Sequence, residues 1–222
     1  MAGTGEQEAE GLLRRGLKLL DLPLADEQVA ALVRYCLELV KWNRKVNLIA
    51  KNTPLPDIVD KHFLDSLTLV PVLDRLLPEG GTLLDVGSGA GFPGLAVKIG
   101  RPSWEVTLLE PRERRVAFLR HIIRTLQLAR IRVEPSRIEE GRLAGGYRII
   151  TGRAVADVPS FLAMVEALVT PETHVVCMQG EGGRQERGPG DRIGVFTCVG
   201  IEESRLPFSG VQRYLLLFRR QG

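Results

Sequence analysis

A short glycine-rich segment holds the residues of this chain whose types and spacing could bind a nucleoside. Residues 83–94 read as a brief apolar strand that runs into a loop with glycine at positions 87, 89 and 91. Glycine lets a backbone turn sharply and lets a ligand approach it closely. Glu110 ends the next apolar run, where a carboxylate can accept hydrogen bonds from a ribose diol. The segment therefore predicts a nucleoside cofactor at one edge of a parallel sheet.

Three interpretations of this loop are open. Gly89–Gly94 matches the pattern G-x-G-x-x-G, and Glu110 follows at about the 20-residue offset that a dinucleotide site expects. The added Asp85, two residues before the glycine run, resembles instead the first motif of Rossmann-like methyltransferases that use S-adenosylmethionine. A loop that binds no ligand is the third interpretation. We favour S-adenosylmethionine as the cofactor.

Composition narrows the class of protein. The chain has 222 residues, of which 44% are hydrophobic and 26% charged, as in ordinary globular domains. It lacks an apolar run of about 18 residues, and its polar start does not resemble a signal peptide. Its three cysteines are far apart, which favours free thiols. No Cys or His pair has metal-ligand spacing. We expect a cytoplasmic monomer that does not associate with a membrane and binds no metal ion.

The first third of the chain is predicted to be helical. Apolar residues recur at the three- and four-residue spacing of a buried helix face, and Asp26 is a plausible N-cap. Prolines and glycines near residues 71–81 predict a linker, so we divide the chain into an N-terminal helical region, 1–78, and a core, 79–222. The expected helices cover Glu6–Leu20, Asp26–Val46 and Asp57–Leu69.

From Thr82 onward, strands alternate with helices, which predicts a mostly parallel sheet. Two final strands without a helix between them predict an antiparallel edge. The fold class is therefore α/β, a Rossmann-like methyltransferase sheet with an appended helical region. The expected strands are Leu83–Val86, Glu105–Leu109, Ile131–Glu134, Arg148–Thr151, His174–Met178, Ile193–Val199 and Tyr214–Phe218, and the expected helices are Gly94–Ile99, Glu113–Leu126 and Val158–Leu168.

Positive charge gathers in one stretch of the core. Between Arg112 and Arg132 there are seven arginines and one acidic residue, although the whole chain carries a net charge of only +3. Such a stripe is typical of a surface that binds nucleic acid, and it is equally compatible with a solvated helix face. The candidates for RNA contact on the predicted helix are Arg114, Arg120 and Arg124.

Five motifs follow one another in a fixed order along the chain. They are a Trp-Asn signature at Lys41–Leu48, a His-x-Leu-Asp-Ser box at His62–Ser66, the cofactor loop Asp85–Gly94, and the segments Ser136–Glu140 and Gly152–Ala154. In this order they resemble the GidB family, the small-subunit ribosomal RNA guanine-N7 methyltransferases. The resemblance runs from about Leu24 to the C-terminus.

This resemblance implies roles for single residues. Gly87 and Phe92 would contact the cofactor, Ile138 and Glu139 would flank its adenine, and Arg153 would lie near the reaction centre. The full set of expected cofactor-binding residues is Asp85, Gly87, Gly89, Gly91, Phe92, Glu110, Ile138, Glu139 and Arg153.

Plainer roles compete with some of these assignments. Arg153 could form a salt bridge to a nearby acid, and Glu139 could complement a helix dipole. We expect Trp42, His62 and Asp65 to join the helical region to the sheet rather than to contact RNA.

The chain also departs from the family, because Gln179-Gly180 stands where the family commonly has Lys-Gly. Arg184 and Arg187 are the candidates to replace that lysine at an RNA phosphate.

The expected substrate atom defines the expected mechanism. Guanine N7 is an acceptor with a free lone pair, so no proton must leave before attack, and we expect no dedicated general base. The resemblance implies methyl transfer to guanine N7 of small-subunit (16S) ribosomal RNA, either free or in the subunit. The alternatives are a Rossmann-like methyltransferase with another substrate and a non-catalytic RNA-binding or ribosome assembly factor.

Overall fold

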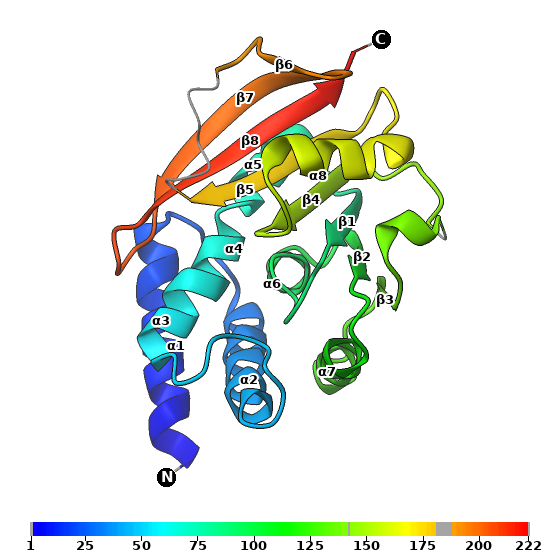
Figure 1. The fold of residues 1–222 in the computed structure, drawn as a ribbon. Helices are drawn as coiled ribbons and strands as arrows, with labels where there is room; N and C mark the ends of the chain where they lie inside the picture. The colour runs from blue at the N-terminus through cyan, green and yellow to red at the C-terminus, as the bar shows by residue number, and fades with distance from the viewer. Residues whose placement is uncertain (1, 142, 181–187, 222) are drawn as a thin grey trace.

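A single sheet with helices on both faces organises the molecule (Figure 1). The structure is a computed structural model, and it describes residues 2–141, 143–180 and 188–221. The strands lie in the order β3-β2-β1-β4-β5-β8-β7-β6. Their bounds are β1 Thr82–Val86, β2 Glu105–Leu109, β3 Ile131–Glu134, β4 Ile149–Arg153, β5 His174–Gly180, β6 Arg192–Ile193, β7 Phe196–Arg205 and β8 Gln212–Arg220.

The pairing of these strands confirms the predicted α/β class. Strands β1 to β5 are parallel to one another, whereas β8 is antiparallel to β5 and β7 is antiparallel to β8. The order of the strands reverses between β1 and β4, because β2 and β3 lie on one side of β1 and β5 lies beyond β4. In open α/β sheets, ligands bind outside the carboxyl ends of the strands at such a reversal.

Helices surround the sheet and fill the N-terminal third of the chain. In Figure 1 the N-terminal helices gather beside the sheet, while α8 covers the face opposite to α6 and α7. The bounds are α1 Ala2–Leu19, α2 Asp26–Asn43, α3 Leu55–Ile58, the π-helix η1 Val59–Leu64, α4 Asp65–Leu67, α5 Val70–Leu76, α6 Gly94–Gly100, α7 Glu113–Thr125, η2 Ile138–Glu140, α8 Val158–Val165 and η3 Glu166–Leu168.

Two local predictions in the helical region are wrong. The expected linker contains α5, because Pro71 falls in the first turn of that helix, where a missing N–H costs nothing. Asp26 is the first residue of α2 rather than its N-cap, and the N–H of the preceding Ala25 donates to Gln28 Oε1 at 2.8 Å. The Asp26 carboxylate accepts from Arg14 instead, at 2.7 Å.

Alternating side chains of the strands separate two apolar clusters. In β8, Leu215 and Leu217 belong to the cluster that includes α1, α2, α6 and α7, whereas Leu216 and Phe218 face α8. This alternation follows from the two-residue period of a strand. The first cluster joins the helical region to the sheet without a break, so the helices position residues at the sheet edge. The division at residue 78 stays a prediction.

Hydrogen bonds join the C-terminal strands to the helical region. Both carboxylate oxygens of the buried Asp60, in η1, accept backbone N–H groups of the turn between β7 and β8, from Phe208 at 3.1 Å and Ser209 at 2.9 Å. The antiparallel pair predicted at the sheet edge is therefore present, and β7 extends well beyond the expected Val199.

Candidate active site

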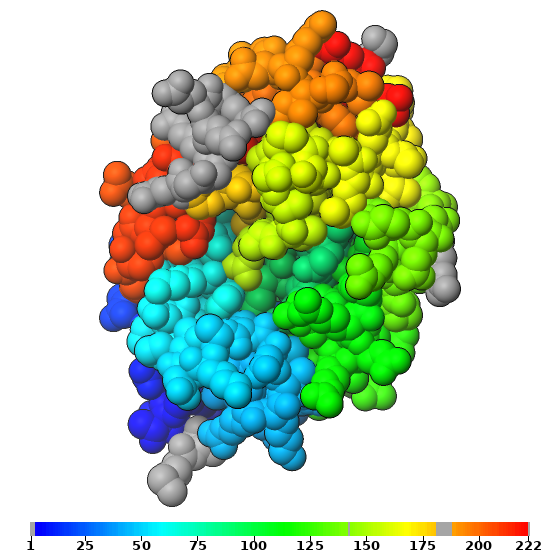
Figure 2. Space-filling view, viewed as in Figure 1, coloured from blue at the N-terminus to red at the C-terminus, as the bar shows by residue number. Residues whose placement is uncertain are grey.

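A cavity of about 890 Å³ opens at the carboxyl ends of β1, β2, β4 and β5. Its volume lies within the range of small-molecule sites. Figure 2 shows the molecule hollowed between the light-blue and cyan segments, the green segment and the yellow-green segment. Residues from distant parts of the chain form its walls: the loop 48–53, η1, the glycine loop, the segment 110–115, residues 153–155, the end of β5 and Arg213.

One wall, here called the glycine wall, comprises the loop from Gly87 to Phe92 together with Glu110. Gly89 has φ +58°, and among the described residues other than its chain neighbours the atom nearest to a side chain there would be Arg115 Nη1 at 3.6 Å. Its open face therefore leaves room for a ligand. Gly91, at φ +100°, requires glycine for steric reasons within the protein. A Cβ there would collide with Leu95 and with Tyr35 Oη.

Glu110 fixes this loop by hydrogen bonds to the backbone. Its Oε2 accepts from the N–H of Gly89 at 2.9 Å, and its Oε1 accepts from the N–H of Arg112 at 2.9 Å. Arg115 Nη1 lies 3.6 Å from the same carboxylate. Each carboxylate oxygen has further acceptor capacity, so these bonds leave Glu110 able to accept ribose hydroxyls as well.

Asp85 supports the glycine wall from behind. Its Oδ2 accepts from the N–H of Gly94 at 2.9 Å, at the start of α6. Burial raises the pKa of this carboxyl to about 7. The other oxygen, Oδ1, is buried without a hydrogen-bond partner among the described residues. Asp85 thus holds the loop and does not line the cavity.

The opposite wall, here called the arginine wall, is built around the buried carboxylate of Asp65. Asp65 Oδ2 accepts from Arg153 Nη1 at 2.9 Å, and Asp65 Oδ1 accepts from Arg213 Nε at 3.0 Å. Arg153 also donates to the carbonyl of Lys61 at 2.8 Å and contacts His62 Nδ1 at 3.1 Å. One carboxylate therefore orients two guanidinium groups at the cavity.

His62 and Phe92 connect the two walls. Burial, together with the charge of Arg153, lowers the pKa of His62 to about 4, so its Nδ1 is free to accept from Arg153 at neutral pH. The rings of His62 and Phe92 stack with centroids 5.4 Å apart, and Arg153 Cζ lies 5.3 Å from the centre of the Phe92 ring. The salt bridge foreseen for Arg153 is present, and Arg153 nevertheless lines the cavity.

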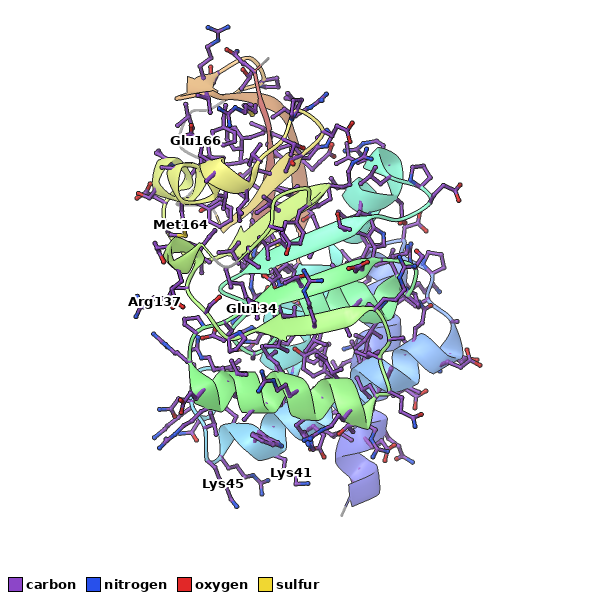
Figure 3. The ribbon with its side chains drawn as sticks, turned by 90° about the vertical axis from the view of Figure 1, so that its right-hand side faces the viewer. Lys41, Lys45, Glu134, Arg137, Met164 and Glu166 are labelled. Carbon is purple, nitrogen blue, oxygen red and sulfur yellow. The ribbon has the colours of Figure 1, made fainter. Side chains whose placement is uncertain are left out.

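The structure brings some expected site residues together and leaves others apart. Gly87, Gly89, Phe92, Glu110 and Arg153 line the cavity, whereas Asp85, Gly91, Ile138 and Glu139 do not. Ile138 and Glu139 lie in η2, beyond the end of β3, and Figure 3 shows the neighbouring Arg137 at the margin of the molecule. Their contact with a cofactor stays a prediction.

The expected RNA contacts are also separated. Arg114, Arg120 and Arg124 are exposed on α7 and lie off the cavity wall. Arg184 and Arg187 lie outside the described residues. Trp42 packs against Phe118 and His121 of α7, with ring centroids 5.5 and 5.0 Å apart. The predicted packing and hydrogen-bond contacts of Trp42, His62 and Asp65 are therefore present. That these residues do not contact RNA stays a prediction.

Sequence reasoning missed several cavity residues. Arg112 and Arg115 were part of the basic stripe but were not singled out, although their place directly after Glu110 puts them at the strand end. Lys61 adjoins the His-x-Leu-Asp-Ser box, which could have pointed to it. Nothing in the sequence marks Arg213 as a cavity residue, because only the pairing of β8 with β5 brings it to the carboxyl ends of the parallel strands.

The family model described as "rRNA small subunit methyltransferase G", GidB, matches residues 28–212. This chain belongs to the GidB family. Among curated GidB relatives, the Ribosomal RNA small subunit methyltransferase G of Desulfotalea psychrophila is 44% identical, covering 93% of this chain and 96% of the relative. That of Geobacter metallireducens is 39% identical, covering 97% and 98%. The family resemblance derived from the motifs is confirmed.

Solved structures support the fold of this GidB chain. The crystal structure of TrmN from Thermus thermophilus superposes with a TM-score of 0.53 at 17% identity, covering 77% of this chain and 55% of that chain. A mutant of MtNAS in complex with S-adenosylmethionine gives a TM-score of 0.58 at 16% identity, covering 97% and 89%. At these identities the likeness concerns the Rossmann-like fold alone.

The described residues contain neither a candidate membrane span nor a candidate metal cluster. No helix there is long and apolar enough to cross a membrane. No group of three or more His, Cys, Asp or Glu residues in the same part of the chain could hold a metal ion.

Proposed function

We propose that this chain transfers a methyl group from S-adenosylmethionine to guanine N7 of small-subunit (16S) ribosomal RNA. The observation that carries the proposal is the cavity at the reversal of strand order, formed by an open glycine loop and Glu110. This geometry occurs in a chain of a family whose relatives are named for the methylation of small-subunit ribosomal RNA. The ribosomal RNA or the small subunit is the macromolecular partner, and we expect a cytoplasmic monomer.

The residues present fit the cofactor. The face of Gly89 is open to the cavity, as a close approach by a ligand requires. Glu110 is fixed at the end of β2 with acceptor capacity for a ribose diol. We assign cofactor contact to Gly87, Gly89, Phe92, Glu110 and Arg153, and the adenine edge to Ile138 and Glu139.

The protein's part in the reaction is alignment. When bound, S-adenosylmethionine supplies an electrophilic methyl group, and guanine N7 presents a lone pair without a proton. Holding two reactants in line can contribute roughly 7–11 kcal/mol in the best cases, so no general base is required. The low pKa of His62 keeps this ring neutral, and Asp65 offsets the charge of Arg153. Both effects limit repulsion of the positive charge that develops on the guanine.

A labelling experiment tests this function. The purified protein is incubated with cofactor carrying a radioactive methyl group and with separated small-subunit, large-subunit and transfer RNA. We expect label in the small-subunit RNA alone, and about tenfold less label with a Glu110→Ala control when the cofactor is limiting. Label in transfer RNA or large-subunit RNA favours a methyltransferase with another substrate. Binding of small-subunit RNA without transfer favours a non-catalytic assembly factor.

A further inference from the structure

The end of α2 and the segment that follows it carry several exposed cations. Residues 41–53 include four basic residues and no acidic residue. Lys41 has a 3.4 Å ion pair with Glu38, whereas Arg44, Lys45 and Lys51 are exposed and have no ion pair with any described residue. Cations that no carboxylate neutralises are available to an anionic partner.

This segment is fixed at the mouth of the cavity. Asn43 Oδ1 accepts from the N–H of Leu48 at 2.9 Å and from the N–H of Ile49 at 3.0 Å. Thr53 Oγ1 donates to the carbonyl of Ala50 at 2.8 Å. The side of the loop formed by residues 48–50 and 53 lines the cavity. The backbone that bears Arg44, Lys45 and Lys51 is therefore held in place beside the site.

The start of α7 lies on the same side. Trp42 packs against His121, and Glu38 pairs with His121 at 2.6 Å, so the end of α2 lies against α7. Arg114 precedes His121 by seven residues, which places both within about 20° on one helix face. Arg120 and Arg124 are turned about 60–100° away from His121. Of the three arginines, Arg114 therefore lies nearest the helix face that packs against α2.

The pictures agree with this placement. Figure 3 shows α2 next to α7, with Lys41 and Lys45 projecting from the end of α2 on the side away from α7. In Figure 2 the light-blue segment after α2 and the green start of α7 adjoin each other at the edge of the hollow. Arg112, the residue before α7, lines the cavity itself.

We infer that Arg44, Lys45, Lys51, Arg112 and Arg114 form a mouth rim that binds the phosphates on either side of the target guanine. The inference rests on the proposed function and specifies where its substrate docks. A base that enters the cavity brings its own backbone to the mouth, and cations carried there by an ordered backbone neutralise the adjacent phosphates. The outer face of α7, with Arg120 and Arg124, is then not the main docking surface.

Two matched double variants test the mouth rim. Arg44→Glu with Lys45→Glu changes the rim, and Arg120→Glu with Arg124→Glu makes the same change of charge on the outer face of α7. Binding of small-subunit RNA, methyl transfer and S-adenosylmethionine affinity are measured for both across a salt series. Thermal unfolding confirms that both variants fold.

The rim variant should bind RNA at least about tenfold more weakly, with a log–log salt slope shallower by about 1.4–1.8 for two lost phosphate contacts. Its cofactor affinity should be unchanged, and the control variant should lose at most about twofold in RNA affinity. Two results overturn the inference if the wild-type protein methylates RNA. They are equal losses of RNA affinity in both variants, and no loss of RNA affinity in the rim variant. A wild-type protein that binds cofactor but methylates no ribosomal RNA overturns the proposed function, and the rim assignment with it.

Discussion

The two walls of the cavity are built in opposite ways. In the glycine wall, the bond from Gly89 to Glu110 joins residues 21 positions apart, through consecutive strand ends. In the arginine wall, Asp65 joins Arg153 and Arg213 across 88 and 148 positions. The first wall is made by backbone conformation and the second by charged side chains. A ligand-binding loop can therefore be local in the sequence, while the groups that face it depend on the whole fold.

The largest expected effect is on the arginine wall. Asp65→Ala leaves two partly buried guanidinium groups without their carboxylate, which typically costs about 3–5 kcal/mol. We expect this loss in the free energy of unfolding, measured by urea titration. The control is Asp57→Ala, which removes an ion pair with Lys61 that is about two-fifths exposed and should cost at most about 1 kcal/mol. Similar losses in the two variants would show that Asp65 does not organise this wall.

The next effect is on cofactor affinity at the glycine wall. Glu110→Ala removes charge-assisted hydrogen bonds worth about 1.5–3 kcal/mol, so affinity for S-adenosylmethionine should fall about tenfold or more. Calorimetry measures this change, with the exposed Glu113→Gln as a control that should bind normally. A wild-type protein that prefers NADH to S-adenosylmethionine would falsify the cofactor assignment in favour of a dinucleotide.

A smaller effect separates backbone strain from ligand contact within the glycine wall. Gly89→Ala and Gly210→Ala both place a side chain at positive φ, +58° and +67°. Each should lose about 1–2 kcal/mol of stability. Only Gly89→Ala should also weaken cofactor binding, because Gly210 lies in the turn between β7 and β8 and does not line the cavity. If a folded Gly89→Ala protein binds the cofactor with unchanged affinity, the open side of Gly89 does not contact the ligand.

The smallest effect at neutral pH concerns the support behind the glycine wall. The pKa of Asp85 is raised to about 7 by burial, so the folded protein holds a proton that the unfolded chain releases above its ordinary pKa of about 4. Stability from this group is complete below pH 4 and is lost as the pH rises through 7. Asp85→Asn should remove a slope of up to about 1.4 kcal/mol per pH unit. Urea titrations from pH 4 to 8 measure how the free energy of unfolding changes with pH. Identical slopes for the wild-type protein and Asp85→Asn would contradict the raised pKa of Asp85.

The predictable parts of the molecule are those that local pattern determines. The sequence predicted the bounds of β2 and β3 correctly, because apolar runs between turn residues define them. It also predicted Gly89 and Glu110 at the cavity, since both follow directly from strand ends. It missed α5, where Pro71 suggested a break but occupies a first turn. Arg213 could not be found, because strand pairing rather than spacing brings it to Asp65.

Nucleoside analysis of methylated RNA tests the central claim most directly. Small-subunit ribosomal RNA that lacks the modification is incubated with the protein and S-adenosylmethionine carrying a carbon-13 methyl group. The RNA is then digested and analysed by mass spectrometry. The account predicts labelled 7-methylguanosine as the single product. Label on another guanine atom or another base, or no label from a protein that binds the cofactor, would contradict it.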